Sequence, residues 1–221
     1  LARIAEESAR GSFSLMAGTT ASTIIAAVGV IVIARLLGPA SYGLYTLAFV
    51  LPSLFAAITD FGLSPALTRY AASLRSQQKY GKLASMIKSA VLVMLVAGAG
   101  AFLLALEFSG QLATLVLRRQ DMGQLVALAS VSILFQGFFS LSYGGLVGLD
   151  RMEQGALLLV LRDTTRVVLS WVLIVVGFGT AGAILGQVLG WILASLVGMM
   201  FLLNQRRGFR NLSSESEADR G

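Results

Sequence analysis

The sequence predicts an all-α integral membrane protein with six transmembrane helices. Its 221 residues are 56% hydrophobic and 13% charged, whereas soluble domains are roughly 45–50% apolar and about 25% charged. The mean hydropathy is +0.81. Six segments also reach the length of about 20 mostly apolar residues that a helix needs to cross a bilayer. A soluble fold of this composition would expose far too much apolar surface, so we expect a multi-pass membrane protein.

The six predicted spans are separated by short polar connections. They are residues 13–34, 42–62, 85–106, 124–147, 156–177 and 181–203, and together they form a transmembrane lobe over residues 13–205. Residues 1–12 are a short amphipathic lead-in on the cytoplasmic side. The first span is longer than the roughly 7–15 apolar residues of a signal peptide, so we expect no cleaved signal. Residues 206–221 are polar and lack periodicity, which predicts a disordered cytoplasmic tail.

Two connections have recognisable turn and helix chemistry. In "LLGPASYG" (36–43), Gly38 can end a helix and Pro39 needs no donor, which predicts a tight hairpin between the first two spans. Residues 63–82 place Leu67, Tyr70 and Leu74 on one helical face. This pattern predicts an amphipathic helix on the cytoplasmic membrane surface.

Small and aromatic residues inside the last two spans indicate how they pack. Gly182, Gly186 and Gly190 recur every four residues, and such a stripe allows two helices to approach closely in lipid. Trp171 and Trp191 fall in the middle of spans rather than at their ends. We therefore expect these two rings to pack or to line a cavity instead of forming an interfacial belt.

The basic residues are distributed unequally between the two sides of the predicted spans. With the N-terminus inside, the opposite side holds Arg35, Arg118 and Arg119, and two arginines lie within the fifth span. This bias obeys the positive-inside rule and predicts a protein of the cell (cytoplasmic) membrane with both termini cytoplasmic. The other twelve of the 17 Lys and Arg lie on the cytoplasmic side: Arg3, Arg10, Arg69, Arg75, Lys79, Lys82, Lys88, Arg151, Arg206, Arg207, Arg210 and Arg220.

The composition excludes most catalytic chemistry. The sequence contains no Cys and no His, so disulfides, Cys/His metal sites and imidazole-based triads are ruled out. No carboxylate cluster has metal-ligand spacing, and no phosphate-binding glycine motif occurs. We predict no enzymatic activity, no metal and no cofactor. The net charge of +6 reports membrane topology, and we expect no nucleic-acid partner because no basic stripe interleaved with aromatic residues occurs.

Three charges interrupt the fifth span, in "VLRDTTRVVLSWV" (160–172). Arg162 and Arg166 are four residues apart and share a helix face, and Asp163 lies within pairing distance of Arg166. At about 1.5 Å per residue, Arg166 lies roughly 16 Å from the turn near Gly177, close to the middle of a hydrocarbon core about 30 Å thick. A central Arg costs at least about 2.5–3.5 kcal/mol against lipid, so we expect these side chains to face protein or a water-filled cavity.

Two regions resemble a known family of transporters. The stretches "ARLLGPASYGLYTLAF" (34–49) and "DFGLSPALTRYAA" (60–72) resemble the N-terminal lobe of polysaccharide and oligosaccharide-lipid flippases, which belong to the multidrug/oligosaccharidyl-lipid/polysaccharide exporter superfamily. The stretch "GLDRMEQGALLLVLRDTTRVVLSWVLIVVGFGTAGAILGQVLG" (148–190) is similar to the family's fifth and sixth spans. The resemblance covers about residues 8 to 205, and it implies one six-helix lobe of an exporter-type bundle.

The resemblance implies a function in polysaccharide biosynthesis. Family members flip lipid-linked oligosaccharide or polysaccharide precursors across the membrane by alternating access, with two lobes around a central cavity. This chain supplies one lobe, so a second six-span lobe is expected from the same parent chain or from a partner chain. Two alternatives stay open: a non-transporting scaffold subunit of a glycan assembly complex, and a drug or cation antiporter lobe of the same superfamily. The antiporter would need more buried acidic residues than Asp60 and Asp163.

The charged residues of the fifth span have two interpretations. In the first, Arg162 and Arg166 bind the diphosphate of a lipid-linked glycan, and Asp163 restrains one of them between cycles. In the second, the three charges neutralise one another and the arginines extend toward the cytoplasm.

Three further residues complete the candidate site. Arg69 contacts either the diphosphate or the anionic lipid of the inner leaflet. Asp60 either gates the cavity or binds a cation, or it caps a helix or pairs with a base. Arg35 also has two interpretations. It either takes part in gating or cation binding, or anchors its helix at the outer interface.

Overall fold

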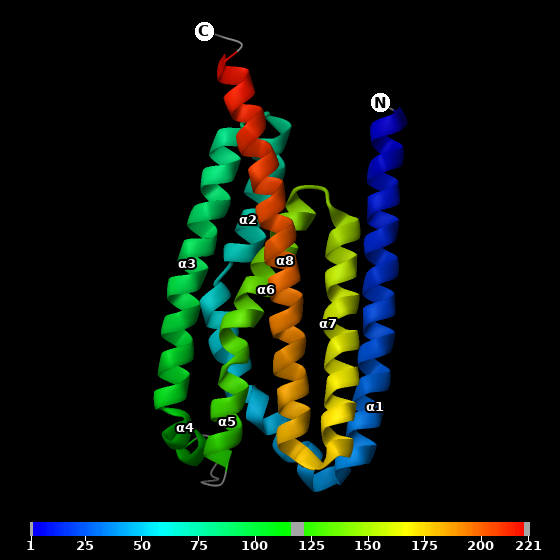
Figure 1. Cartoon of the computed structure of the whole chain (residues 1–221), viewed down its shortest axis with the longest axis vertical. Coiled ribbons are helices and arrows are strands. Elements are labelled where there is room, and N and C mark those ends of the chain that lie inside the picture. Colours follow the sequence, from blue (N-terminus) through cyan, green and yellow to red (C-terminus); the bar gives the residue numbers. More distant parts are fainter. Residues whose placement is uncertain (1, 116–121, 219–221) are drawn as a thin grey trace.

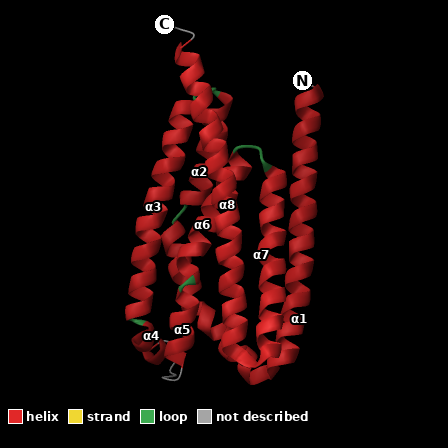
Figure 2. Ribbon diagram, viewed as in Figure 1, coloured by secondary structure: helices red, strands yellow, loops and turns green. Residues whose placement is uncertain are grey.

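The computed structural model describes residues 2–115 and 122–218, and these are almost entirely helical (Figure 1). Figure 2 shows helix and loop, and no strand, within these residues. The predicted all-α class is therefore confirmed. The elements are α1 (Ala2–Asp60), α2 (Leu63–Ser76), α3 (Tyr80–Glu107), α4 (Ser109–Leu115), α5 (Gly123–Ser130), α6 (Ser132–Gly148), α7 (Met152–Leu173), the π-helical segment η2 (Ile174–Phe178) and α8 (Gly179–Ala218).

Four continuous helical runs in the described chain are long and apolar enough to cross a membrane. They are Gly11–Ser76, Tyr80–Glu107, Gly123–Gly148 and Met152–Gln205. The first and last runs, of 66 and 54 residues, each contain two of the six predicted spans, whereas the second and third contain one each. The structure therefore shows four long runs, and the count of six crossings remains a prediction.

Glycines interrupt the two longest runs where the predicted turns lie. Gly38 has φ 74° and ψ 167° inside α1, and Gly177 has φ 106° inside η2. Both conformations are in the positive-φ region that glycine adopts without a steric penalty. After Gly177 the chain reverses, so that α7 and α8 run side by side (Figure 1).

The two chain termini lie at the same end of the bundle (Figure 1). The connection between α6 and α7 is also at this end, and the connection between α7 and α8 is at the other. Arg118 and Arg119, predicted on the outer side, lie outside the described residues. α8 continues to Ala218, so the structure has helix through most of the segment for which the composition predicts disorder.

Close helix packing depends on small residues at the contacts. A side chain at Gly186 would collide with Ser170 of α7, and one at Gly190 would crowd Arg166. Similarly, Gly18 of α1 packs directly on Ala156. The glycine stripe of the last span therefore faces α7, and the small residues bring backbones together as expected in lipid.

One face of α2 packs on the bundle, and its location at the cytoplasmic membrane surface stays a prediction. Leu67 is 3% exposed and Ala71 is fully buried, because α2 packs against α6 and α3. The hydroxyl of Thr68 donates to the carbonyl of Gly144 at 2.8 Å. Tyr70, on the other hand, is 60% exposed. The predicted apolar face is thus divided between the bundle and the surroundings.

Candidate functional site

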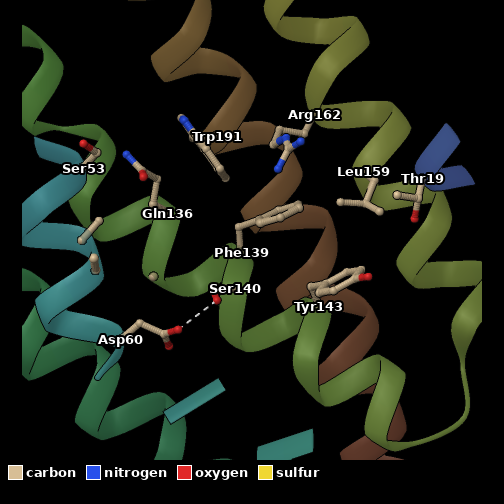
Figure 3. Close-up of a pocket in the computed structure, with 13 residues that line it drawn as sticks. Thr19, Ser53, Asp60, Gln136, Phe139, Ser140, Tyr143, Leu159, Arg162 and Trp191 are labelled. Carbon is tan, nitrogen blue, oxygen red and sulfur yellow. Dashed lines mark hydrogen bonds between the residues drawn. The ribbon is translucent and has the colours of Figure 1, made fainter. Parts of the chain in front are cut away.

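A cavity of about 490 Å³ lies between α1, α6, α7 and α8 (Figure 3). Its size is within the roughly 300–1,000 Å³ of typical small-molecule sites. Polar, charged and aromatic side chains make up most of its lining: Thr19, Ser53, Asp60, Gln136, Phe139, Ser140, Tyr143, Arg162 and Trp191.

Arg162 reaches this cavity from α7. Its Nε and Nη2 donate to the two oxygens of Asp163, at 3.1 and 2.7 Å. The guanidinium carbon also lies 5.1 Å from the ring centre of Phe139 and 5.0 Å from that of Trp191. Two aromatic faces and a bidentate carboxylate contact therefore hold the guanidinium in place. The hydrogen bonds to Asp163 use Nε and Nη2 and leave Nη1 available to another acceptor.

Asp163 is the centre of a buried polar group between α1 and α7. It is 2% exposed, and it accepts a hydrogen bond from the hydroxyl of Ser22 on α1. Arg166 Nη2 lies 3.7 Å from the other carboxylate oxygen. A buried carboxylate requires such donors, because an unpaired charge in this position would be very costly.

Arg166 is separated from Arg162 by the same carboxylate. It is not among the residues that line the cavity, and its Nε is buried with no hydrogen-bond partner in the described part of the chain. Its stem packs against Gly190 of α8. The structure therefore brings Arg162 to the cavity and leaves Arg166 in the packing between helices.

Asp60 lies at the end of α1, where it faces the cavity and also supports the next helix. One oxygen accepts from the amide and the hydroxyl of Ser64 in the first turn of α2, at 3.2 and 2.5 Å. The other accepts from the hydroxyl of Ser140 on α6 at 3.3 Å. In the structure Asp60 thus starts a helix and presents a carboxylate to the cavity at the same time.

A second cavity, of about 520 Å³, continues from the first. The two share Asp60, Ser140 and Tyr143. Arg69 lines the second cavity and is exposed. Arg35 is also exposed, on α1, and lines neither cavity.

Several lining residues were not predicted from the sequence. Phe139 and Tyr143 are one turn apart on α6, with ring centres 6.3 Å apart, and Phe139 meets Trp191 edge-on at 5.2 Å. Gln136 is one turn before Ser140 on the same helix. The available signal was the run "QGFFSLSYGG" (136–145), in which polar and aromatic residues recur inside an apolar span. The two tryptophans were expected to pack or to line a cavity. Trp191 lines the cavity, whereas Trp171 is 49% exposed.

The chemistry of the cavity is that of binding. It has a guanidinium at one side, a carboxylate at the other, and hydroxyl, amide and aromatic groups between them (Figure 3). Among the described residues no group of three or more acidic side chains could hold a metal ion. The arrangement can bind a polar molecule that offers both an anionic group and hydrogen-bond donors.

Comparisons with known proteins identify similar sequences and folds. A family model described as polysaccharide biosynthesis protein matches residues 8–217. No curated protein matches the sequence.

The fold is similar to that of solved transporters of the MOP superfamily. The TM-score is 0.76 with an outward-facing multidrug resistance transporter of the MATE family, at 16% identity, over 88% of this chain and 45% of that one. With an inward-facing multidrug resistance transporter of the MATE family, the TM-score is 0.75 at 15% identity, over 88% of this chain and 47% of that one. With a MOP superfamily transporter from Pyrococcus furiosus, the TM-score is 0.70 at 22% identity, over 90% of this chain and 45% of that one. The chain therefore spans a little less than half the length of these proteins.

Proposed function

The chain belongs to the polysaccharide biosynthesis protein family, and from this premise we propose that it is one lobe of a membrane transporter. The lobe flips a lipid-linked oligosaccharide or polysaccharide precursor across the cytoplasmic membrane by alternating access. Its fold is that of half a MOP superfamily transporter.

The proposed topology has six crossings with both termini in the cytoplasm. In this topology the breaks at Gly38 and Gly177 separate the two crossings within each of the two longest helical runs. The common end of the two termini and the bias of basic residues toward that end support this orientation.

The observation that carries the proposal is the position of Arg162 in the cavity. A guanidinium in the membrane region is costly unless it serves a site or a partner. Arg162 is held by Asp163 and two aromatic rings, so its remaining donors have a fixed direction. A planar donor group of this kind suits a phosphate oxygen. We assign the diphosphate of the substrate to this residue.

The other candidate residues have different roles in the proposal. Arg69 lines the second cavity and meets the substrate, or the anionic leaflet, on its way in. Asp163 restrains Arg162, and Arg166 supports Asp163 from the helix packing. We assign no transport role to Arg35, which lies outside both cavities, and propose that it anchors α1 at the outer interface.

A second lobe completes the proposed transporter. The solved transporters with a similar fold are about twice as long as this chain. The second lobe comes from the same parent chain or from a partner, and it closes the cavity around the substrate. Because the substrate path lies between lobes, we expect no flipping by a single lobe.

One observation favours a second candidate, an antiporter lobe for organic cations. Asp60 presents a carboxylate to a cavity that also contains the rings of Phe139, Tyr143 and Trp191, and carboxylates and aromatic faces attract cations. A scaffold subunit, by contrast, has no need of an open, polar cavity.

Binding by the purified chain in nanodiscs tests the proposal. Replacing Trp171 by Phe leaves Trp191 as the single tryptophan, since the sequence contains two. A short-tailed glycosyl diphosphate should change the Trp191 fluorescence and saturate, and ethidium, as the cation probe, should not. Saturation by ethidium alone would favour the antiporter, and no response to either ligand would favour the scaffold.

A further inference from the structure

Asp60 forms no ion pair with any basic side chain that the structure describes. It lines both cavities and belongs to none of the ion pairs found among the described side chains. Its donors are neutral groups, namely the amide and hydroxyl of Ser64 and the hydroxyl of Ser140. Asp60 therefore brings an uncompensated negative charge to the place where the cavities meet.

The positive side of the cavity is weaker than the presence of an arginine suggests. The charge of Arg162 is partly neutralised by Asp163, because Arg162 Nη2 lies 2.7 Å from Oδ2 of that carboxylate. Arg166 is attached to the same carboxylate and does not line the cavity. The first cavity is thus polarised, with a partly neutralised cation at one side and the Asp60 carboxylate at the other, and Arg69 lines the second cavity.

A ligand must span the distance between these two groups. In Figure 3, Ser140 and Phe139 lie between Asp60 and Arg162, and Tyr143 lies beside them. Hydroxyl and aromatic groups of this kind suit a sugar ring, whose edges form hydrogen bonds and whose faces are apolar. A sugar attached to a phosphate at Arg162 would extend along these groups toward Asp60.

We propose that Asp60 selects the substrate by charge. The sugar next to the diphosphate is neutral or carries an amino group, and a sugar that carries a carboxylate is rejected. This inference rests on the proposed function, and it narrows the class of glycan that the lobe accepts.

The selection follows from the remaining capacity of the carboxylate. A carboxylate has about four acceptor positions, and the three donors observed leave room for a hydroxyl or ammonium group of the ligand. A uronate at the same place would set two anions against each other in a partly water-excluded site, which opposes binding. Specificity thus depends on repulsion as well as attraction.

Binding of three matched probes tests the inference. The probes are farnesyl diphosphates that carry glucosamine, N-acetylglucosamine or glucuronic acid, titrated against the full chain in nanodiscs with Trp191 as the single tryptophan. The glucuronyl probe should bind at least about tenfold more weakly than the N-acetylglucosaminyl probe. In Asp60→Asn, which keeps an oxygen to accept from Ser64, this ratio should fall to within about threefold.

Ser64→Ala serves as the control for the helix start. It removes the hydroxyl that donates to Asp60 and keeps the charge, so the preference against the acidic sugar should persist. If Ser64→Ala abolished the preference as Asp60→Asn does, the helix start rather than the charge would set it, and the inference would be overturned.

The remaining outcomes separate this inference from the proposed function. Equal binding of the three probes, or an unchanged ratio in Asp60→Asn, would end the idea of charge selection and leave glycan binding by the cavity intact. Failure of every sugar probe to bind either protein would contradict the proposed function, and charge selection with it.

Discussion

The hydroxyl of Ser22 on α1 donates a hydrogen bond to the buried carboxylate of Asp163 on α7. The two residues are 141 positions apart in the chain, and their contact joins the first helix to the one that carries Arg162. Because Asp163 also holds Arg162, α1 contributes indirectly to the geometry of the candidate site.

Replacing Ser22 by Ala should lower stability by about 1 kcal/mol. A lost partner of a buried polar group costs roughly 1–3 kcal/mol, and the lower value applies because both arginines still contact Asp163. Thermal unfolding in detergent measures the change. The control is Thr23→Ala, which removes an exposed hydroxyl that bonds only to its own helix, to the carbonyl of Thr19, and should stay within about 0.5 kcal/mol. Equal unfolding temperatures for the two variants would contradict a structural role for Ser22.

Gly186→Ala and Gly100→Ala should have opposite effects on stability. A methyl group at Gly186 meets the backbone and hydroxyl of Ser170, whereas one at Gly100 on α3 meets nothing within 4 Å. The first should therefore separate α7 from α8 and destabilise by about 1–3 kcal/mol. The second should be neutral, or stabilise by up to about 1 kcal/mol through helix propensity. Unfolding temperatures of the two variants provide the comparison, and similar values would mean that the α7–α8 contact is loose enough to adjust.

The fold was predictable from the sequence to the level of its apolar segments and turns. The length of each apolar segment can be read from local composition. Gly38 and Gly177 have positive φ at the two places where turns were expected. The packing of α2 against α6 was not predicted, for a physical reason. Gly144 and Gly148 of α6 make room for α2, and the sequence of α2 contains no sign of this partner.

The candidate site was less predictable, because its residues come together from distant helices. The four-residue spacing of Arg162 and Arg166 places both on one helix face, yet only Arg162 lines the cavity. Its guanidinium is held there by Asp163 and by the rings of Phe139 and Trp191. These rings come from α6 and α8. The sequence of a single helix does not show which helix faces meet, so the aromatic residues that line the cavity could not be predicted from it.

Single cysteines should report the topology, because the chain has none of its own. If both termini are cytoplasmic, cysteines at Ser41 and Gln111 should react with an impermeant thiol reagent on intact cells. Cysteines at Gln77 and Glu153 should react only after permeabilisation. Gln77, Gln111 and Glu153 are exposed, so access to the side chain does not limit the reaction. The reverse labelling pattern would invert the orientation, and labelling of all four on intact cells would contradict the six-crossing topology.

The two arginines of α7 should respond differently to the same substitution. Arg162→Gln removes the cation that lines the cavity, so the dissociation constant for a glycosyl diphosphate should rise about tenfold or more. Arg166→Gln leaves the cavity unchanged and weakens the support of Asp163, so it should lower the unfolding temperature and leave the binding constant nearly unchanged. Trp191 lies against Arg162, so binding constants, and not fluorescence amplitudes, are the quantities to compare.

Arg162→Lys and a double variant decide whether binding or mutual neutralisation explains the charges. Lysine keeps the charge and loses the planar pair of donors that holds Asp163 and meets a phosphate, so binding should recover only in part. If the charges only neutralise one another, Arg162→Gln should instead lower the amount of folded protein and leave binding unaffected. The double change Arg162→Gln with Asp163→Asn should then restore that amount in part, because residue 163 no longer needs a counter-ion, whereas Arg166 loses its carboxylate partner. Normal glycan binding by this double variant would remove Arg162 from the binding site, whereas a stable double variant that binds weakly would place the guanidinium on the substrate.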